Sequence, residues 1–255
     1  MRAAGPDEVV LVLVSGGGSA LLPVPAKGLT LADKLQATRA LAARGARIDE
    51  LNTVRKHLSA VKGGQLAAAA SGARQLVALV LSDVIGDPLD VIASGPTVPD
   101  TSTFQDCLDV VARLGAEPHL PPAVLARLRD GAAGRVPETP RSSEPCFRRT
   151  ETLVVGSNRL ALQAAAAEAT KRGYEVQHLG DRLAGEASDL GRRLATQALD
   201  AARAGRRVCL LGGGEPTVTL RGSGKGGRNQ ELALAALSVL RGAPHVVLLS
   251  AGTDG

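Results

Sequence analysis

Aromatic residues are almost absent from this sequence of 255 residues. Tryptophan is missing, and Phe104, Phe147 and Tyr174 are the only aromatic residues. Proteins that bind single-stranded nucleic acid stack its bases on aromatic rings, so the sequence predicts no nucleic-acid partner despite a net charge of +5. The basic residues are scattered along the chain. They indicate a solvated surface or, alternatively, the attraction of a small anionic ligand into a cleft.

Cysteines and long apolar runs are also scarce. Cys107, Cys146 and Cys209 are isolated, odd in number and without metal-ligand spacing, which favours a reducing compartment. No apolar run approaches the roughly 18 residues of a membrane span, and residues 1–8 lack the layout of a signal peptide. We therefore expect no membrane partner and a cytoplasmic location, with a mitochondrial location as the alternative.

The sequence is rich in alternating apolar strands and amphipathic helices. Val9–Val14 is apolar without alternation, as is typical of a strand buried on both faces of a parallel sheet. Further strands are predicted at Gln75–Leu81, Leu153–Val155, Tyr174–His178, Val208–Leu211 and His245–Leu249. Helices are predicted at 29–44, 48–61, 104–114, 186–203 and 232–240. The pattern predicts an α/β fold, a mostly parallel sheet with flanking helices (Rossmann-like), plus a partial second α/β domain.

Small residues follow the first strand. Ser15, Gly16, Gly17, Gly18 and Ser19 form a strand–glycine–helix junction. Glycines permit positive φ and close approach of a ligand, and free N–H groups at a helix start favour phosphate or carboxylate. A plain tight turn is the alternative.

Basic residues cluster on the helix predicted at 48–61 and just after it. Arg55 and Lys62 are seven residues apart and share a face, with Lys56 alongside. This arrangement predicts that their positive charges converge on substrate or phosphate. A solvated basic helix face is the alternative.

Acidic and hydroxyl residues follow the second strand. Asp83, Asp87 and Asp90 lie where open α/β sheets bind ligands, and one or two such carboxylates suffice for Mg²⁺. Ordinary turn residues are the alternative. Ser94 lies in a second loop of small residues. Residues 115–150 hold six of the fourteen prolines and are interpreted as an excursion or linker, with one helix near 123–129.

The later strand ends carry similar loops. Asn158 lies at a strand-to-helix junction, as a ligand contact or a helix cap. Gly213, Gly214 and Glu215 follow the strand at 208–211. The glycine-rich stretch 222–231 fails the P-loop pattern, because Thr219 stands at the first glycine position and Gly226 after the lysine. It still carries Lys225 and Arg228 into a helix start, which suits polyphosphate, unless it is a basic surface loop.

The order of these motifs resembles the class II, MOFRL-type glycerate kinases over nearly the whole chain except 115–150. The matching motifs are 15–21, 51–59, 62–64, 82–87, 92–97, 156–158, 213–218, 226–231 and 252–255.

The resemblance implies ATP-dependent phosphorylation of D-glycerate, with 2-phosphoglycerate as the expected product, Mg²⁺ as cofactor, and small molecules as partners; it leaves a homodimer open. It implies that Arg228 is the catalytic arginine. On physical grounds we expect Lys225 to stabilise the transferring phosphoryl group together with Arg228, and Asp83 to take part through Mg²⁺. By the same resemblance, Ser15–Ser19 are expected to hold substrate or phosphate, and Arg55, Lys56 and Lys62 to line the cleft. From the residues themselves we add to the binding candidates Asn52, Ser94, Asn158, Gly213, Gly214 and Glu215, and we expect Asp83 and Asp87 to bind the metal.

Members of this family are longer at both ends. The resemblance implies that residues 1–205 of this chain belong to an incomplete first domain and residues 206–255 to a partial MOFRL-type domain. It also implies that the family's amino-terminal catalytic lysine has no counterpart here. A nucleotide- or anion-binding fragment without activity is therefore the alternative function. Some relatives are called hydroxypyruvate reductases, but no dinucleotide fingerprint follows Gly18.

Overall fold

The computed structural model of the chain describes residues 4–222 and 224–252. It divides into two compact units, Met1–Val155 and Gly156–Gly255. The boundary expected at 205/206 therefore lies inside the second compact unit, because the strand and helix that precede it pack against those that follow.

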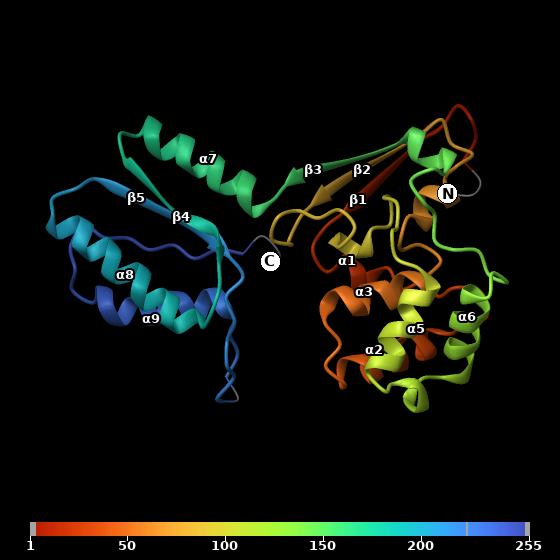
Figure 1. The fold of residues 1–255 in the computed structure, drawn as a ribbon. Helices are drawn as coiled ribbons and strands as arrows, with labels where there is room; N and C mark the ends of the chain where they lie inside the picture. The colour runs from red at the N-terminus through yellow and green to blue at the C-terminus, as the bar shows by residue number, and fades with distance from the viewer. Residues whose placement is uncertain (1–3, 223, 253–255) are drawn as a thin grey trace. The chain divides into compact units, whose positions relative to one another are not determined.

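The first unit is built on a three-stranded sheet in the order β1-β2-β3, with β1 at Val9–Val14, β2 at Gln75–Leu81 and β3 at Thr150–Gly156 (Figure 1). The pairing of β1 with β2 is parallel, with Val9 opposite Gln75 and Val14 opposite Val80. Each strand falls where the apolar runs predict it.

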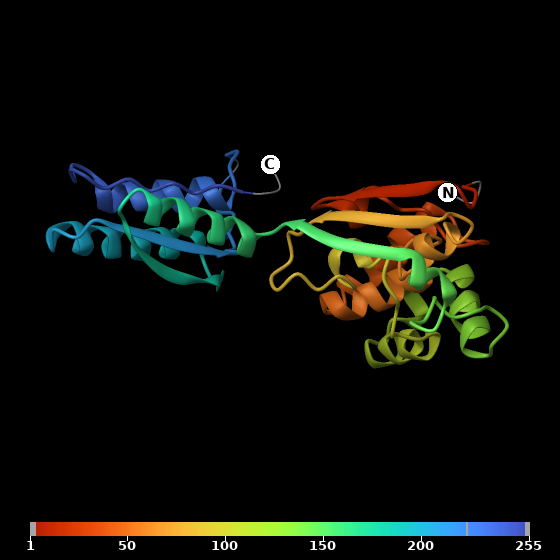
Figure 2. The same ribbon diagram turned by 90° about the horizontal axis from the view of Figure 1, so that it is seen from above.

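Helices lie on one side of this sheet (Figures 1 and 2). They are α1 (Gly18–Leu21), α2 (Leu31–Ala42), α3 (Ile48–His57), α4 (Gln65–Ala69), α5 (Phe104–Arg113) and α6 (Pro122–Ala132), with short 3-10 turns η1 (Ile92–Ser94), η2 (Glu117–His119) and η3 (Pro145–Arg149). Thr30 caps α2 in a capping box with Asp33, and Gly45 follows the helix at φ +77°. Threonine at a helix start and glycine after its end are common helix-end signals in a sequence.

Residues 115–150 are part of the first unit's core, so their interpretation as a linker is wrong. Leu120, Val124 and Leu128 are buried against Leu41, Leu51, Val54 and Leu58. Phe104 completes this core and packs so closely on α6 that a Cβ at Gly131 would overlap its ring. Three of the six prolines, Pro118, Pro122 and Pro145, lie in the first turn of a helical segment.

The opposite face of the three-stranded sheet is open. Along β1, Val9, Leu11 and Leu13 are 54%, 58% and 72% exposed, whereas Val10 and Val12 pack against buried Leu76 and Ala78. The expectation that β1 is buried on both faces is therefore wrong for the described residues. An unbroken apolar run does not reveal whether both faces find partners.

The second unit pairs β4 (Glu175–Leu183) with β5 (Val208–Gly214) in parallel and carries α7 (Asn158–Lys171), α8 (Ala187–Arg203) and α9 (Arg228–Leu240). Helices α8 and α9 are in close contact: a Cβ at Gly191 would overlap the carbonyl of Leu232.

The strand predicted at His245–Leu249 does not form. These residues are irregular, with His245 at φ +65° and Val247 and Leu249 about nine-tenths exposed at 92% and 88%. Within residues 4–222 and 224–252, none of the helices combines the length and apolar character of a membrane span.

Candidate functional site

A cavity of about 440 Å³ opens in the first unit where β1 and β2 end and α2 and α3 begin. The carboxyl ends of parallel strands are the usual ligand edge of an open α/β sheet. The predicted residues on its wall come from four segments: Ser15, Gly17, Gly18, Ser19, Asn52, Arg55, Lys62 and Asp83. Leu31, Leu35 and Ile48 form its apolar rim.

The turn after β1 holds its shape through glycine. Gly17 is at φ +76°, and the N–H of Gly18 donates to the Ser15 carbonyl before the single turn α1. A Cβ at Gly16 would lie 2.8 Å from Asp83 Oδ2 and 3.3 Å from Asp83 Cβ, so a side chain at this position would displace the Asp83 carboxylate. Within the described part of the chain, the N–H groups of Gly16 and Gly17 have no acceptor.

Lys62 is a buried cation that closes the floor of the cavity. Only 2% of the residue is exposed, and Nζ donates to Ser19 O at 2.8 Å, Ser19 Oγ at 2.9 Å and Ala93 O at 3.3 Å. Burial lowers the pKa of Lys62 to about 8, with smaller effects of the cations Lys34 and Arg55.

Arg55 is the cation available to a ligand. It is half-buried, lines the cavity and makes no hydrogen bond or ion pair with any described residue. Burial lowers its pKa. With Lys34 and Lys62 it gives the wall three bases against one acid, Asp83. The wall therefore has the charge that an anionic ligand requires.

Lys56 does not join this group. Its Nζ lies 3.2 Å from Asp100 Oδ1 in a buried ion pair, and Asp100 also accepts from Ser102 and Thr139. The next residue, His57, is fully buried between the Thr53 carbonyl and Glu138. The basic residues of this stretch thus divide: Arg55 and Lys62 line the cavity, whereas Lys56 and His57 lie in the interior.

A strained loop supports the cavity from behind. Ala93, Ser94 and Gly95 all have positive φ, at 51°, 61° and 60°, which is costly for non-glycine residues. The N–H groups of Gly63 and Gly64 hold the loop by donating to the carbonyls of Ser94 and Gly95. Ser94 is fully buried, and its Oγ lies 3.0 Å from Ser19 Oγ.

The two predicted metal ligands differ in position. Asp83 is exposed on the cavity wall without a hydrogen bond or ion pair to the described residues, whereas Asp87 is not part of the wall. In residues 4–222 and 224–252 no three His, Cys, Asp or Glu side chains form a metal cluster. Asp83 fits an ion such as Mg²⁺, which takes one or two carboxylates together with phosphate oxygens and water.

In the second unit, the structure brings Asn158 against Gly213. Ser157 caps α7, which leaves Asn158 free to donate from Nδ2 to the Asp181 carbonyl at 3.0 Å. A Cβ at Gly213 would overlap the Asn158 amide, and a Cβ at Gly214 would overlap Leu183. The glycine run therefore serves the close packing of β4, β5 and α7 at this strand end.

Arg228 begins α9 and is positioned by Glu215, whose Oε1 lies 2.9 Å from Nη1. Lys225 lines a separate cavity of about 680 Å³ within this unit, together with Arg192, Arg221 and the turn at Gly226 and Gly227. The predicted site residues thus belong partly to the first unit and partly to the second. Thr253–Gly255, the end of the last motif, lie outside the described residues.

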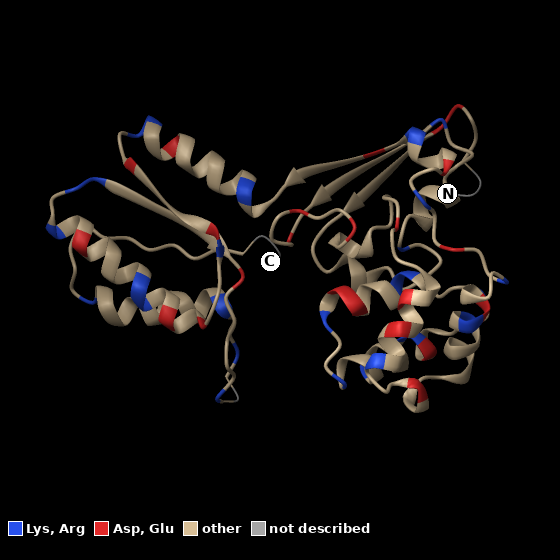
Figure 3. Ribbon diagram, in the orientation of Figure 1, with Lys and Arg blue, Asp and Glu red and all other residues tan. Residues whose placement is uncertain are grey.

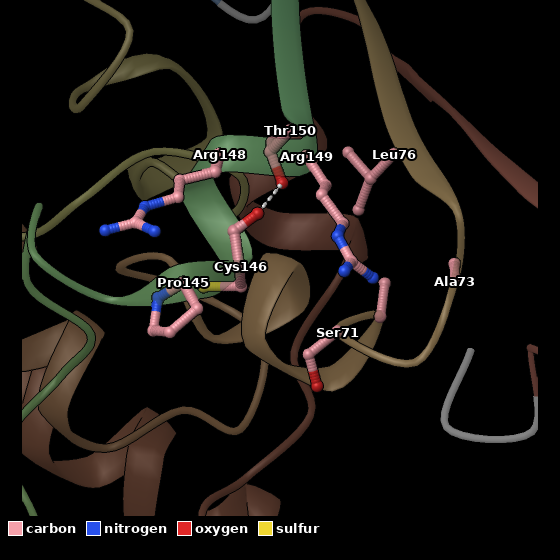
Figure 4. Close-up of a pocket in the computed structure, with 9 residues that line it drawn as sticks. Ser71, Ala73, Leu76, Pro145, Cys146, Arg148, Arg149 and Thr150 are labelled. Atoms are coloured by element: carbon pink, nitrogen blue, oxygen red, sulfur yellow. Dashed lines mark hydrogen bonds between the residues drawn. The ribbon is translucent and has the colours of Figure 1, made fainter. Parts of the chain in front are cut away.

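A further cavity of about 250 Å³ lies in the first unit near the start of β3 (Figure 4). Its polar groups do not converge: Arg148 and Arg149 point in different directions, and Thr150 Oγ1 donates to the Cys146 carbonyl. Figure 3 shows Lys and Arg interspersed with Asp and Glu over both units, as the scattered sequence charges predict.

Sequence reasoning missed one residue of the cavity wall, Lys34, and the two acidic partners of the interior bases, Asp100 and Glu138. Lys34 is buried on the cavity wall, where its position on the apolar stripe of α2 was a readable signal. Asp100 and Glu138 were missed because their partners lie 44 and 81 residues away, and no spacing rule reaches that far.

Two sequence families match the chain. A domain of unknown function, DUF4147, matches residues 1–129, and the MOFRL family matches residues 208–255.

Several proteins are similar over nearly its whole length. Glycerate kinase of Macaca fascicularis is 42% identical over 98% of the chain and 72% of the relative. Glycerate 2-kinase of Pyrococcus horikoshii is 38% identical over 100% of the chain, and a protein of Agrobacterium vitis named as a hydroxypyruvate reductase is 44% identical; the chain spans 58% and 57% of these relatives. The crystal structure of glycerate kinase from Thermotoga maritima superposes with a TM-score of 0.80 at 38% identity, covering 95% of the chain and 56% of that structure.

Proposed function

Because the chain belongs to the MOFRL-type glycerate kinase family, we propose that it acts in the ATP-dependent phosphorylation of D-glycerate. The observation that carries the proposal is the cation-lined cavity of the first unit, with three bases and one acid on its wall and a free guanidinium at Arg55. A small hydroxycarboxylate matches that charge. The Pyrococcus relative named glycerate 2-kinase supports phosphorylation at the 2-hydroxyl.

Phosphoryl transfer depends chiefly on positioning and charge neutralisation. Arg55 can bind the glycerate carboxylate through two parallel hydrogen bonds, and the free N–H groups of Gly16 and Gly17 can donate to anionic oxygens. Asp83 would hold Mg²⁺, which neutralises phosphate charge when bound. Arg228, oriented by Glu215, and the loop cation Lys225 would stabilise the transferring phosphoryl group.

A binding experiment tests the first half of this proposal. Arg55→Ala should weaken D-glycerate binding at least about tenfold by titration calorimetry, since a charge-assisted pair contributes about 1.5–3 kcal/mol. The free energy of unfolding should stay within about 0.5 kcal/mol, because Arg55 has no hydrogen-bond or ion-pair partner among the described residues. Arg39→Ala, on the exposed side of α2, is the matched control. Equal affinity in both variants would remove Arg55 from the site.

The second candidate is a nucleotide- or anion-binding protein without turnover. Each unit has a cavity lined by basic side chains, with Arg55 in the first and Lys225 in the second, and either cavity by itself suits an anionic ligand. Binding of ATP and D-glycerate without product would identify this function.

A further inference from the structure

A chain of hydrogen bonds runs from Lys62 to Asn52 beneath the cavity. Lys62 Nζ lies 2.9 Å from Ser19 Oγ, which lies 3.0 Å from Ser94 Oγ, and Ser94 Oγ donates to Asn52 Oδ1 at 3.2 Å. Its members come from α1, α3, η1 and the turn after α3. Lys62, Ser94 and Asn52 are 2%, 0% and 6% exposed, so the chain is built into the interior.

The donors and acceptors of this hydrogen-bond chain can be arranged in only one direction, from Lys62 to Asn52. An ammonium group only donates, so Ser19 Oγ accepts from Lys62. The single hydroxyl hydrogen of Ser94 goes to Asn52 Oδ1, which leaves Ser94 Oγ to accept the hydrogen of Ser19. Lys62 therefore orders both hydroxyls, and the last acceptor is the side-chain oxygen of Asn52.

Asn52 is left with its donor side available. Its Oδ1 is engaged by Ser94, and its Nδ2 donates to no described residue. In the described part of the chain every fully buried side-chain N or O atom has a partner, so Nδ2 opens to the cavity that Asn52 lines. Asn52 and Arg55 are three residues apart on α3 and share this face.

We propose that Asn52 is a specificity-determining residue, and that Lys62, Ser19 and Ser94 are positioning residues that fix its amide so that Nδ2 donates to a substrate oxygen beside Arg55. The inference rests on the glycerate site of the proposed function and deepens it. Two neighbouring donors select a substrate end that only accepts hydrogen bonds, a carboxylate, over an amide or an ammonium group.

The test compares D-glycerate with its neutral amide, D-glyceramide, by calorimetric binding to the full chain. Asn52→Asp keeps the acceptor for Ser94 but replaces the donor with a charged oxygen. We expect it to weaken D-glycerate binding at least about 30-fold and to leave glyceramide binding equal or tighter. Gln36→Glu, an exposed amide-to-acid change on α2, is the control and should preserve the preference of the wild type.

A second variant addresses the positioning residues and covers a failure of Asn52→Asp to fold. Ser94→Gly removes the hydroxyl and suits the positive φ of Ser94. Because the side-chain amide of Asn52 can then rotate and exchange its oxygen and nitrogen, glycerate binding should fall about tenfold. The preference for glycerate over glyceramide should shrink. An unchanged preference in either folded variant overturns the inference while the proposed function stands. A wild type that binds no D-glycerate overturns the proposed function, and the inference with it.

Discussion

Lys62 is a buried cation whose charge is costly to bury. Burial lowers its pKa to about 8 from 10.5, so between these values the unfolded chain holds a proton that the folded chain has released. Raising the pH through this window therefore favours the folded state.

We predict that the free energy of unfolding of the wild type, relative to Lys62→Met, rises by up to about 3 kcal/mol between pH 8 and pH 10.5. Below pH 7.5 the difference between the two proteins should be flat. Denaturant titrations at a series of pH values measure it. A constant difference across the whole range would show that Lys62 titrates in the folded chain as it does in water.

Lys56 has a structural role, in contrast to Lys62. Burial alone would raise the pKa of Asp100, but the Lys56 ammonium and the hydrogen bonds of Ser102 and Thr139 lower it overall. Removing one partner leaves the other charge buried without its partner.

Lys56→Met should therefore destabilise the chain by about 3–5 kcal/mol without changing its affinity for D-glycerate. Chemical denaturation and calorimetry on the same preparation separate the two effects. Normal stability together with weakened glycerate binding would place Lys56 in the site and contradict the structural role.

At the scale of elements, the turn between α3 and α4 determines where Lys62 lies. Gly64 is at φ +78°, and a Cβ there would lie 2.8 Å from both the Val98 carbonyl and the Phe147 ring. Gly28 has a similar φ of +86° with nothing within 4 Å. Substitution at Gly28 therefore measures backbone strain alone, whereas substitution at Gly64 measures strain together with steric overlap.

Gly64→Ala should cost about 3 kcal/mol or more of unfolding free energy, because strain of about 1–2 kcal/mol adds to overlap. Gly28→Ala should cost only about 1 kcal/mol, from strain alone. Equal losses in thermal or denaturant unfolding would show that the turn relaxes around the new methyl group.

Elements were predictable where their signals are local. The range of β2 matched its apolar run, and Thr30 and Gly45 marked the ends of α2. The left-handed segment at Ala93 and Ser94 was not predictable, because non-glycine residues carry no sequence mark for positive φ. The strand expected at 245–249 failed because a strand needs a partner, and its own residues cannot specify one.

At the scale of the whole molecule, the α/β class and the ligand edge followed from strand ends that carry glycine, serine and acids. The sequence did not show which basic residues line the cavity and which form interior ion pairs. Arg55, Lys56 and Lys62 differ in role only through contacts with segments far along the chain, among them Ser19 and Asp100. Likewise, the open face of β1 depends on what packs against the sheet, which an apolar run alone leaves unspecified.

The most direct test of the account is a coupled ATP-turnover assay with D-glycerate, Mg²⁺ and the full chain. We predict glycerate-dependent turnover that Arg228→Ala lowers by at least about 10²-fold, as expected for loss of a group that stabilises developing charge, while glycerate binding in the first unit is kept. A folded chain that binds D-glycerate and ATP but forms no product would contradict the proposed phosphoryl transfer.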